Sequence, residues 1–343
     1  MSPKLLVYLP NIINFLTMLQ QSIKTQVVGV DIGYEKTTYA IVDVRGNELA
    51  RDSFPTGDYP DVNAFVSHLS EKIVGFVEAH VGYENIRSVG ISAPSGNFLT
   101  GCIEHSPNLL WKGEIPLAAM MRDRLGLAVA VGNDAYVMAL GEATFGSAHG
   151  MKDFIVIVLD RGLGSCVFSR GQAHLGNSGY AGEIGHTCID SEGRLCGCGH
   201  LGCLETYCNA EGIVLTAKEM LAATDEPSLM RQAGELSPKL IFEYCEQGDR
   251  LAIEVFRKTG ETLGMSLANY ASVVDPEAII ITGSVSKAGK WIMEPLNESF
   301  EEHVFHNIQN KVKILTSSLD EDERAVLGAS VLAWSVKEYS LFK

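Results

Sequence analysis

The sequence predicts two α/β domains that face each other across a cleft. A run of β-branched residues over 26–31 leads through a glycine turn into a second strand over 37–42, and the same layout returns at 154–160 and 165–169. Helical patterns follow both units, and strands that alternate with helices are typical of α/β folds. A chain of 343 residues with 46% hydrophobic content can bury two such cores. We therefore expect a duplicated α/β core that binds ligands at the carboxyl ends of its strands.

The other elements follow from hydrophobic periodicity. In the first half we expect helices over 61–80, 117–125 and 135–145, with a buried strand over 129–131 before the last of them. In the second half we expect helices over 211–222, 237–247 and 251–274 and then a strand that ends in a turn at Gly283. A closing helix over 319–336 would have its acidic run at the N-terminal end, where the helix dipole favours negative charge.

Composition excludes some classes of partner. A net charge of −15 argues against nucleic acid, because binding phosphates requires a basic surface. Eight cysteines without a convincing export signal indicate a reducing compartment, so we expect a cytoplasmic protein. Residues 1–25 are expected to form an N-terminal extension and not a membrane anchor, because their apolar stretch is too short to span a bilayer and contains Pro10, Asn11 and Asn14. The extension is also too short for a DNA-binding domain.

Three cysteines and two histidines cluster between residues 179 and 205. Cys196, Cys198 and Cys203 lie in one short loop, and the glycines between them permit sharp turns. His186 or His200 would supply a fourth ligand, and four Cys and His ligands are typical of a structural zinc ion. The alternative is three ordinary thiols in a glycine-rich loop. The close spacing favours zinc.

Two carboxylates bracket this cluster in the sequence. Glu183 precedes His186, and Glu205 follows Cys203. An ion that fixes the loop would also fix these carboxylates, and rigid carboxylates are suited to accept hydrogen bonds from the hydroxyl groups of a ligand.

At these residues the sequence resembles the ROK family of bacterial sugar kinases and sugar-sensing repressors. The resemblance rests on the run Gly182-Glu-Ile-Gly-His186 and the run Cys196-Gly-Cys-Gly-His-Leu-Gly-Cys-Leu-Glu205, and it extends over about residues 26–336. It implies the two-domain sugar kinase/actin-like (ribonuclease H-like) fold with a zinc knuckle. The implied domains are 26–140, with helix 322–343 packing back on it, and 141–321. The implied zinc ligands are His186, Cys196, Cys198 and Cys203.

The resemblance also implies a sugar site. The run Asn133-Asp134-Ala135 would supply a sugar-binding amide and the catalytic base, and phosphorylation of a hydroxyl requires such an acceptor carboxylate nearby. The alternative is that Asp134 only caps a helix, and Asn97 could likewise be a plain turn residue. Ser95 is a second candidate in that turn, and Ser106-Pro107-Asn108-Leu109 matches another family loop. The residues assigned to the sugar are Asn97, Asn133, Asp134, Glu183, His186 and Glu205.

A nucleotide site is implied at three glycine turns. The residues assigned to Mg²⁺–ATP are Asp31, Gly33, Lys36, Thr37, Gly162, Gly164, Gly283 and Ser284. Both phosphate loops depart from the family pattern: Tyr34 and Glu35 replace Gly and Thr, and Asp160-Arg161 replaces Gly-Thr. Carboxylates beside a polyphosphate are unfavourable by at least about 1 kcal/mol, and Lys36 and Arg161 are the cations that would offset them. The alternative is that both loops are solvated turns that bind no nucleotide.

These observations lead to two hypotheses of different classes. The first is an ATP-dependent kinase for a hexose such as glucose, with Asp134 as general base. The second is a zinc-containing sugar sensor or scaffold without kinase activity, which would explain an intact sugar motif beside altered phosphate loops. A DNA-binding repressor is disfavoured by the negative charge. Because family members commonly self-associate, we also expect a dimer or tetramer.

Overall fold

The computed structural model describes residues 24–336. The expected extension over 1–25 lies almost wholly outside the described residues, and so do the last residues of the predicted segment 322–343. Within the described range, no helix is both long enough and apolar enough to cross a membrane.

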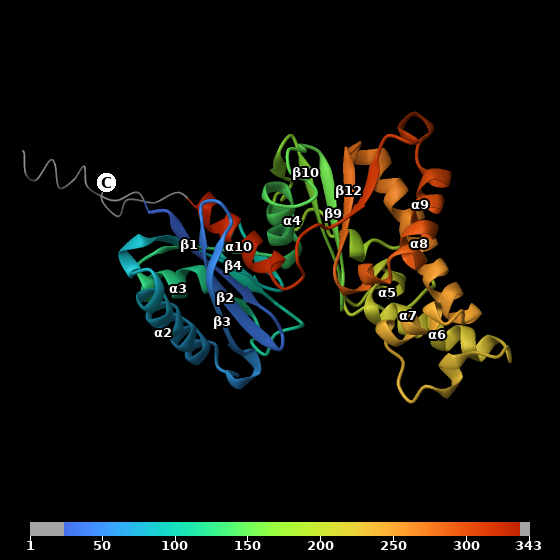
Figure 1. The fold of residues 1–343 in the computed structure, drawn as a ribbon, viewed down its shortest axis with the longest axis horizontal. Helices are drawn as coiled ribbons and strands as arrows, with labels where there is room; N and C mark the ends of the chain where they lie inside the picture. The colour runs from blue at the N-terminus through green and yellow to red at the C-terminus, as the bar shows by residue number, and fades with distance from the viewer. Residues whose placement is uncertain (1–23, 337–343) are drawn as a thin grey trace, which may run out of the picture.

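Two five-stranded sheets with the same topology organise the chain (Figure 1). In each sheet, three antiparallel strands are followed by two parallel ones. The first sheet has the order β3-β2-β1-β4-β8, with β1 (Gln26–Ile32), β2 (Lys36–Asp43), β3 (Glu48–Pro55), β4 (Ile86–Ser92) and β8 (Ala128–Gly132). The second has the order β11-β10-β9-β12-β13, with β9 (Phe154–Leu159), β10 (Leu163–Ser169), β11 (Gln172–Ala173), β12 (Ala278–Thr282) and β13 (Lys313–Thr316). The predicted duplication is confirmed by this shared order.

The helices and a small third sheet complete the fold. The third sheet contains β5 (Gly96–Asn97), β6 (Cys102–Glu104) and β7 (Glu114–Ile115). The α-helices are α2 (Val62–His80), α3 (Leu117–Leu125), α4 (Asp134–Thr144), α5 (Glu205–Cys208), α6 (Ala210–Ala223), α7 (Pro238–Glu246), α8 (Arg250–Val274), α9 (Lys290–His303) and α10 (Arg324–Ser335). The 3₁₀ turns are η1 (Thr56–Asp58), η2 (Tyr83–Asn85), η3 (Ile184–His186), η4 (Leu229–Gln232), η5 (Ser284–Ala288) and η6 (His306–Ile308).

Apolar side chains on both faces of each sheet arrange the helices in layers. One face of the first sheet packs against α2 and α3, and the other packs against α10. One face of the second sheet packs against α4, and the other packs against α6, α7, α8 and α9. Helices α4 and α10 also pack on each other, so they lie between the two sheets (Figure 1). The domain boundary near residue 140 stays a prediction.

Glycines allow α10 to lie directly on the first sheet. A Cβ at Gly90 of β4 would meet the Ala329 carbonyl oxygen at 2.0 Å, and one at Gly29 of β1 would meet the Val326 carbonyl oxygen at 2.4 Å. The Ser88 hydroxyl also donates a hydrogen bond of 2.8 Å to the Ala333 carbonyl. Any side chain at Gly29 or Gly90 would therefore push the helix off the sheet.

Two predicted features of the second half require correction. The closing helix begins at Arg324 and not near 319, because residues 317–323 form the connection from β13. Within that connection the Ser317 hydroxyl donates to the Glu142 carboxylate, and the Arg51 guanidinium donates to the Asp322 carbonyl at 2.7 Å. Helix α9 was not predicted, because Pro295 interrupts its periodic pattern.

We expect Gly90→Ala to lower the free energy of unfolding by about 1–3 kcal/mol, as overpacked cores do. Gly75→Ala is the matched control, because Gly75 lies on α2 and a Cβ at this position would have nothing within 4 Å. The control should be neutral or stabilising by up to about 1 kcal/mol. Urea denaturation of both variants measures the difference, and equal stabilities would contradict the close packing of α10.

Candidate active site

A cavity of about 740 Å³ lies between the two halves of the chain. Its walls come from the ends of strands in both sheets and from the loops that follow them, which is where α/β folds bind ligands. Its polar and glycine lining residues include Ser95, Glu104, Asn108, Asn133, Asp134, Arg161, Gly162, Gly164, Tyr180, Glu183, His186, Arg194 and Glu205.

Asn133 and Asp134 join the end of β8 to the start of α4. Asn133 is the N-cap: its Oδ1 accepts hydrogen bonds from the backbone N–H of Ala135 at 2.8 Å and of Tyr136 at 3.4 Å. Asp134 is the first helical residue and not the N-cap, although its side chain also accepts the N–H of Ala135. The Nδ2 group of Asn133 donates to no protein atom among residues 24–336, so it is free to donate to a ligand.

The carboxylate of Asp134 occupies an environment that disfavours its charge. Burial raises the pKa of this carboxyl, and the nearby charge of Asp160 raises it further, whereas the backbone N–H of Ala135 opposes the shift. Its Oδ1 accepts that N–H at 2.8 Å. A carboxylate with a raised pKa is a stronger proton acceptor than an exposed aspartate.

A second carboxylate, Asp31, lies at the end of β1. Burial raises its pKa to about 6, and the charge of Asp134 adds to this shift while Lys36 opposes it. The two aspartates therefore share one electrostatic environment. Because burial disfavours the negative charge, a divalent cation at Asp31 would relieve an unfavourable state, and carboxylate oxygens are the ligands that Mg²⁺ prefers.

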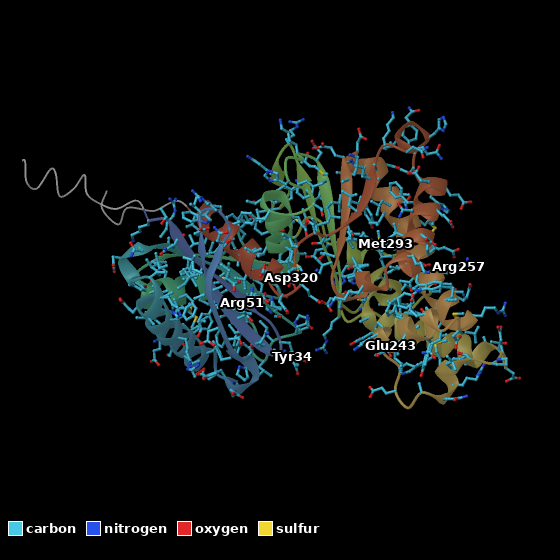
Figure 2. All side chains as sticks on the ribbon, in the orientation of Figure 1. Tyr34, Arg51, Glu243, Arg257, Met293 and Asp320 are labelled. Carbon is cyan, nitrogen blue, oxygen red and sulfur yellow. The ribbon has the colours of Figure 1, made fainter. Side chains whose placement is uncertain are left out.

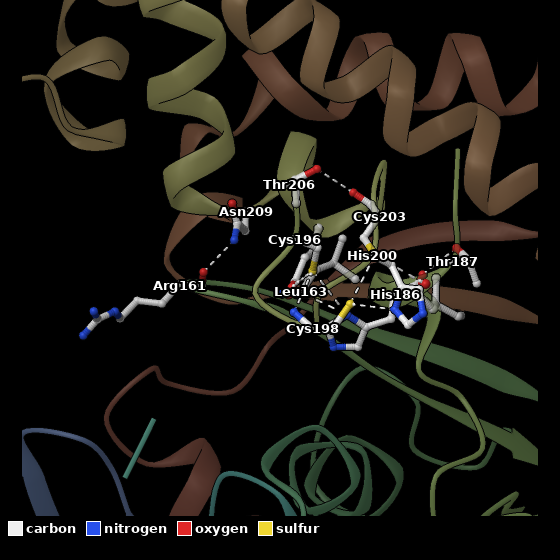
Figure 3. Close-up of polar contacts among 12 residues, drawn as sticks. Arg161, Leu163, His186, Thr187, Cys196, Cys198, His200, Cys203, Thr206 and Asn209 are labelled. Atoms are coloured by element: carbon white, nitrogen blue, oxygen red, sulfur yellow. Dashed lines mark hydrogen bonds and ion pairs between the residues drawn. The ribbon is translucent and has the colours of Figure 1, made fainter. Parts of the chain in front are cut away.

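His186 and three cysteines form a candidate metal site (Figure 3). One ligand atom from each of His186, Cys196, Cys198 and Cys203 lies within 4.8 Å of all the others. Cys198 Sγ lies 3.6 Å from Cys203 Sγ, and Cys196 Sγ lies 3.7 Å from His186 Nδ1. Zinc–sulfur bonds of about 2.3 Å in a tetrahedron would separate the sulfurs by roughly 3.8 Å, so the donor set and its spacing fit Zn²⁺.

The same geometry distinguishes the two candidate histidines. His200 Nδ1 lies 3.5 Å from Cys198 Sγ but does not belong to the group of four converging ligand atoms. The resemblance to the family selected His186, and the convergence supports that choice. The backbone N–H of His200 contributes most to a pKa of about 6 for Cys198, which favours the thiolate that metals bind.

Local turns bring the cysteines together. The backbone N–H of Cys196 donates to the His200 carbonyl at 2.8 Å, and Cys188 and Cys203 form an isolated β-bridge. Gly202 has a φ of 67°, and a Cβ there would meet the Asp190 carbonyl oxygen at 1.6 Å. Only glycine fits this close approach of the two backbones.

Glu205 ties the metal site to the cavity. Its Oε1 lies 3.0 Å from Cys196 Sγ and 3.6 Å from His186 Nδ1, and its Oε2 accepts the backbone N–H of Leu163 at 3.4 Å. Burial raises the pKa of the neighbouring Glu183, and Asp134 and Glu205 add to the shift while His186 opposes it. Both carboxylates line the cavity together with His186.

The residues assigned to a nucleotide do not all share one environment. Gly162 and Gly164 line the cavity. Ser284 donates a hydrogen bond of 2.7 Å to Asp160 Oδ1, which joins the turn after Gly283 to the second phosphate loop. Gly33 and Lys36 close the first turn, because the Gly33 N–H donates to the Lys36 carbonyl at 3.0 Å. Thr37, in contrast, is buried with its hydroxyl 2.8 Å from that of Thr56, so it does not face the cavity.

The geometry gives no support to Asn97 as a sugar contact. Asn97 is 2% exposed, and its Nδ2 donates to the Ser178 carbonyl at 2.8 Å and to Glu104 at 3.1 Å. Its Oδ1 accepts the Leu99 N–H at 2.9 Å, and Asn97 does not line the cavity. Its role as a sugar contact stays a prediction that this structure does not favour.

Other polar residues near this strand do line the cavity. They are Ser95, Glu104, Asn108 and Tyr180, and the last donates a hydrogen bond to Glu104. Ser95 was predicted as a second candidate for a sugar contact in the turn that contains Asn97. The Ser106-Pro107-Asn108-Leu109 motif carried the signal for Asn108, whereas no local pattern marked Glu104 or Tyr180.

Comparison with known proteins extends this picture. The model of the ROK family matches residues 27–336. The glucokinase of Streptomyces coelicolor is 33% identical over 313 residues, which cover 89% of this chain and 96% of that protein. A ROK family glucokinase from Streptomyces griseus, solved in complex with glucose and AMPPNP, is 32% identical with a TM-score of 0.76 and covers 91% of this chain and 100% of its own.

A regulator has a similar fold. The ROK family transcriptional regulator described as a homologue of the E. coli MLC protein is 25% identical with a TM-score of 0.80, and the match covers 90% of this chain and 78% of that one. Kinases and regulators are therefore both similar to this chain. The predicted sugar kinase/actin-like fold is confirmed by these matches, and the chain belongs to the ROK family.

Proposed function

We propose that this protein transfers a phosphoryl group from ATP to a hexose, glucose or a closely related sugar, with Asp134 as the general base. The observation that carries the proposal is that Asp134 opens into the same cavity as Asn133, Glu183, His186 and Glu205. The similarity to glucokinases supports a sugar kinase, and one of them was solved with glucose and AMPPNP.

The sugar would be held by hydrogen bonds from both walls of the cavity. The carboxylates of Glu183 and Glu205 accept from sugar hydroxyls, and the free Nδ2 of Asn133 donates to one. With Nδ1 of His186 directed at the metal site, the other ring nitrogen donates to a hydroxyl, because binding a metal at one nitrogen fixes the tautomer. These contacts place the reactive hydroxyl within reach of Asp134.

The chemical step requires little from the protein beyond positioning and charge. Asp134 accepts the proton of the attacking hydroxyl, and its burial keeps its basicity high. Mg²⁺ near Asp31 would supply charge neutralisation for the phosphates of the donor, which is the main requirement of phosphoryl transfer. The altered loops carry Glu35 and Asp160 beside that site, so charge neutralisation is the demanding part of this reaction.

A second candidate function is a sugar-binding sensor or scaffold without kinase activity. Two observations favour it: Tyr34, Glu35, Asp160 and Arg161 replace small residues of the family pattern, and a regulator is among the similar structures. Restoring the family residues by Tyr34→Gly, Glu35→Thr, Asp160→Gly and Arg161→Thr separates the two functions. A restored variant that binds Mg²⁺–ATP when the natural chain does not would establish the sensor.

We expect Asp134→Asn to reduce kcat for hexose phosphorylation by about 10²- to 10⁴-fold, because the amide cannot accept the proton. The dissociation constant for the sugar should change little. Asp58→Asn, at an exposed residue of η1, is the control for loss of one negative charge and should retain full activity. Calorimetry and a coupled ADP assay measure both constants, and an active Asp134→Asn variant would exclude Asp134 as the base.

We expect the reaction rate to fall at a higher pH than it would for an enzyme whose aspartate base has an ordinary pKa. The ionised form of Asp134 is the active one, and burial raises its pKa above the usual value of about 4. Asp31, whose pKa burial raises to about 6, also loses its cation-binding charge as the pH falls through that value. We expect kcat to fall as pH decreases through about 6. A rate that stays constant down to pH 4.5 would contradict these assignments.

We also infer that the ion bound by His186, Cys196, Cys198 and Cys203 is a structural Zn²⁺. Metal analysis should find one zinc per chain, and Cys203→Ser should lose the zinc, lower Tm and weaken sugar binding because Glu183 and Glu205 lose their fixed loop. Cys188→Ser is the matched control, since Cys188 is exposed and outside the group of four ligands. Full sugar affinity in a zinc-free Cys203→Ser variant would show that the ion does not organise the site.

A further inference from the structure

Tyr34 and Arg161, two residues that depart from the family pattern, contact each other across the cleft. Tyr34 lies in the turn between β1 and β2, and Arg161 lies in the turn between β9 and β10. The Arg161 Cζ atom lies 5.2 Å from the centroid of the Tyr34 ring, which is a cation–π contact. Figure 2 shows Tyr34 on the side of the first sheet that faces the second half. Residues 127 positions apart (161 − 34) therefore form a pair that bridges the two phosphate loops.

The backbone of Arg161 is held firmly. Its carbonyl accepts the Asn209 Nδ2 at 2.7 Å, and the carbonyl of Asp160 accepts the Ala210 N–H at 2.9 Å. Both bonds fix the turn to the start of α6. Figure 3 shows that the Arg161 side chain points away from the cysteine cluster. The turn is thus rigid at its base while the guanidinium extends into the cleft.

The guanidinium of Arg161 has no polar partner among residues 24–336. It donates no hydrogen bond and forms no ion pair with any of residues 24–336. Arg194, the other arginine that lines the cavity, is occupied by the carbonyls of Thr206 and Gly212 and by Glu219. The acidic residues of the lining are Glu104, Asp134, Glu183, Glu205 and Glu211. Within the described part of the chain, Arg161 is therefore the guanidinium available to an anion entering this cavity.

The strength of the cation–π contact between Tyr34 and Arg161 determines whether it hinders or helps the binding of a phosphate. Both side chains are exposed, and an exposed cation–π contact biases a conformation by only about 2- to 5-fold. A charge-assisted hydrogen bond contributes about tenfold or more, and a guanidinium can form two to one phosphate. The stacked arrangement is therefore too weak to exclude a phosphate. It biases the guanidinium toward a position over the cleft before the ligand arrives.

We propose that Arg161 binds the polyphosphate tail of the phosphoryl donor, and that the Tyr34 ring positions its guanidinium. This arrangement would replace the cradle of small residues in the family pattern and offset the charges of Glu35 and Asp160. The proposal rests on the proposed kinase function. Because a polyphosphate tail belongs both to a nucleoside triphosphate and to inorganic polyphosphate, Mg²⁺–ATP and Mg²⁺–tripolyphosphate are separate probes.

The test compares Arg161→Ala, Arg161→Lys, Tyr34→Ala, Tyr34→Phe and the double variant Tyr34→Ala/Arg161→Ala in the full chain. Arg124→Ala, at an exposed residue of α3, is the control for loss of one positive charge. Calorimetry measures the Kd of each probe and of glucose, and a coupled assay measures kcat and KM for ATP. Comparison of ATP with tripolyphosphate shows whether the nucleoside contributes to donor binding.

We expect Arg161→Ala to weaken both probes by about tenfold or more while the Kd of glucose changes by less than about twofold. Arg161→Lys should be intermediate, because an ammonium cannot form the paired hydrogen bonds. Tyr34→Ala should weaken the probes by about 2- to 5-fold, and Tyr34→Phe should behave as the natural chain does. The double variant should bind no more weakly than Arg161→Ala alone, because the ring acts through the guanidinium.

Several results would overturn the inference. Arg161→Ala that matches Arg124→Ala, in a chain that does phosphorylate glucose, would exclude Arg161 and leave the proposed function intact. Additive effects of the two substitutions would exclude the positioning role of Tyr34. Tighter binding by Arg161→Ala or Tyr34→Ala would show that the pair obstructs the donor. A natural chain that binds neither probe and phosphorylates no sugar would overturn both this inference and the kinase function.

Discussion

Four ligand atoms from His186, Cys196, Cys198 and Cys203 converge within 4.8 Å, and the arrangement of the cavity wall that carries Glu183 and Glu205 depends on that convergence. The three cysteines lie in a loop whose two sides are joined by the isolated β-bridges Cys188–Cys203 and Leu195–Leu201, and His186 ends the 3₁₀ turn η3. Glu205 lies two residues after the last cysteine, and Glu183 precedes the histidine by three residues. Whatever neutralises the thiolates therefore also sets the distance between the two carboxylates that face a ligand.

The opposite wall depends on close packing. Helix α4 lies between the sheets, packs on β9 and β10 and contacts α10, which rests on Gly29 and Gly90 of the first sheet. Asp134 begins α4, so the position of its carboxylate is set by the same contacts that join the two halves. The start of α4 packs on the second sheet through Ala135 and Ala139, and the charge of Asp134 is close enough to raise the pKa of Glu183.

Local patterns predicted the long periodic elements and the ligand loop. The helix expected over 251–274 extends over Arg250–Val274, and the close spacing of the cysteines predicted the group of four converging ligand atoms. Longer-range features were not predictable in this way. Helix α9 was missed because Pro295 interrupts its hydrophobic pattern. The cavity is lined by Asn108 and not by Asn97, which is buried in the small sheet. The contact between Tyr34 and Arg161 depends on packing between the two halves of the chain. A turn's sequence shows its conformation but not which side chain across the cleft it will meet.

The central question is whether this acidic cleft accepts a polyphosphate in addition to a sugar. Calorimetric titration of the zinc-loaded protein with glucose and, separately, with Mg²⁺–ATP answers it most directly, followed by an assay for ADP when both are mixed. Saturable binding of each ligand and release of ADP together with sugar phosphate are the predicted results. Binding of glucose without measurable binding of Mg²⁺–ATP would contradict the kinase function and would leave a metal-stabilised sugar-binding protein.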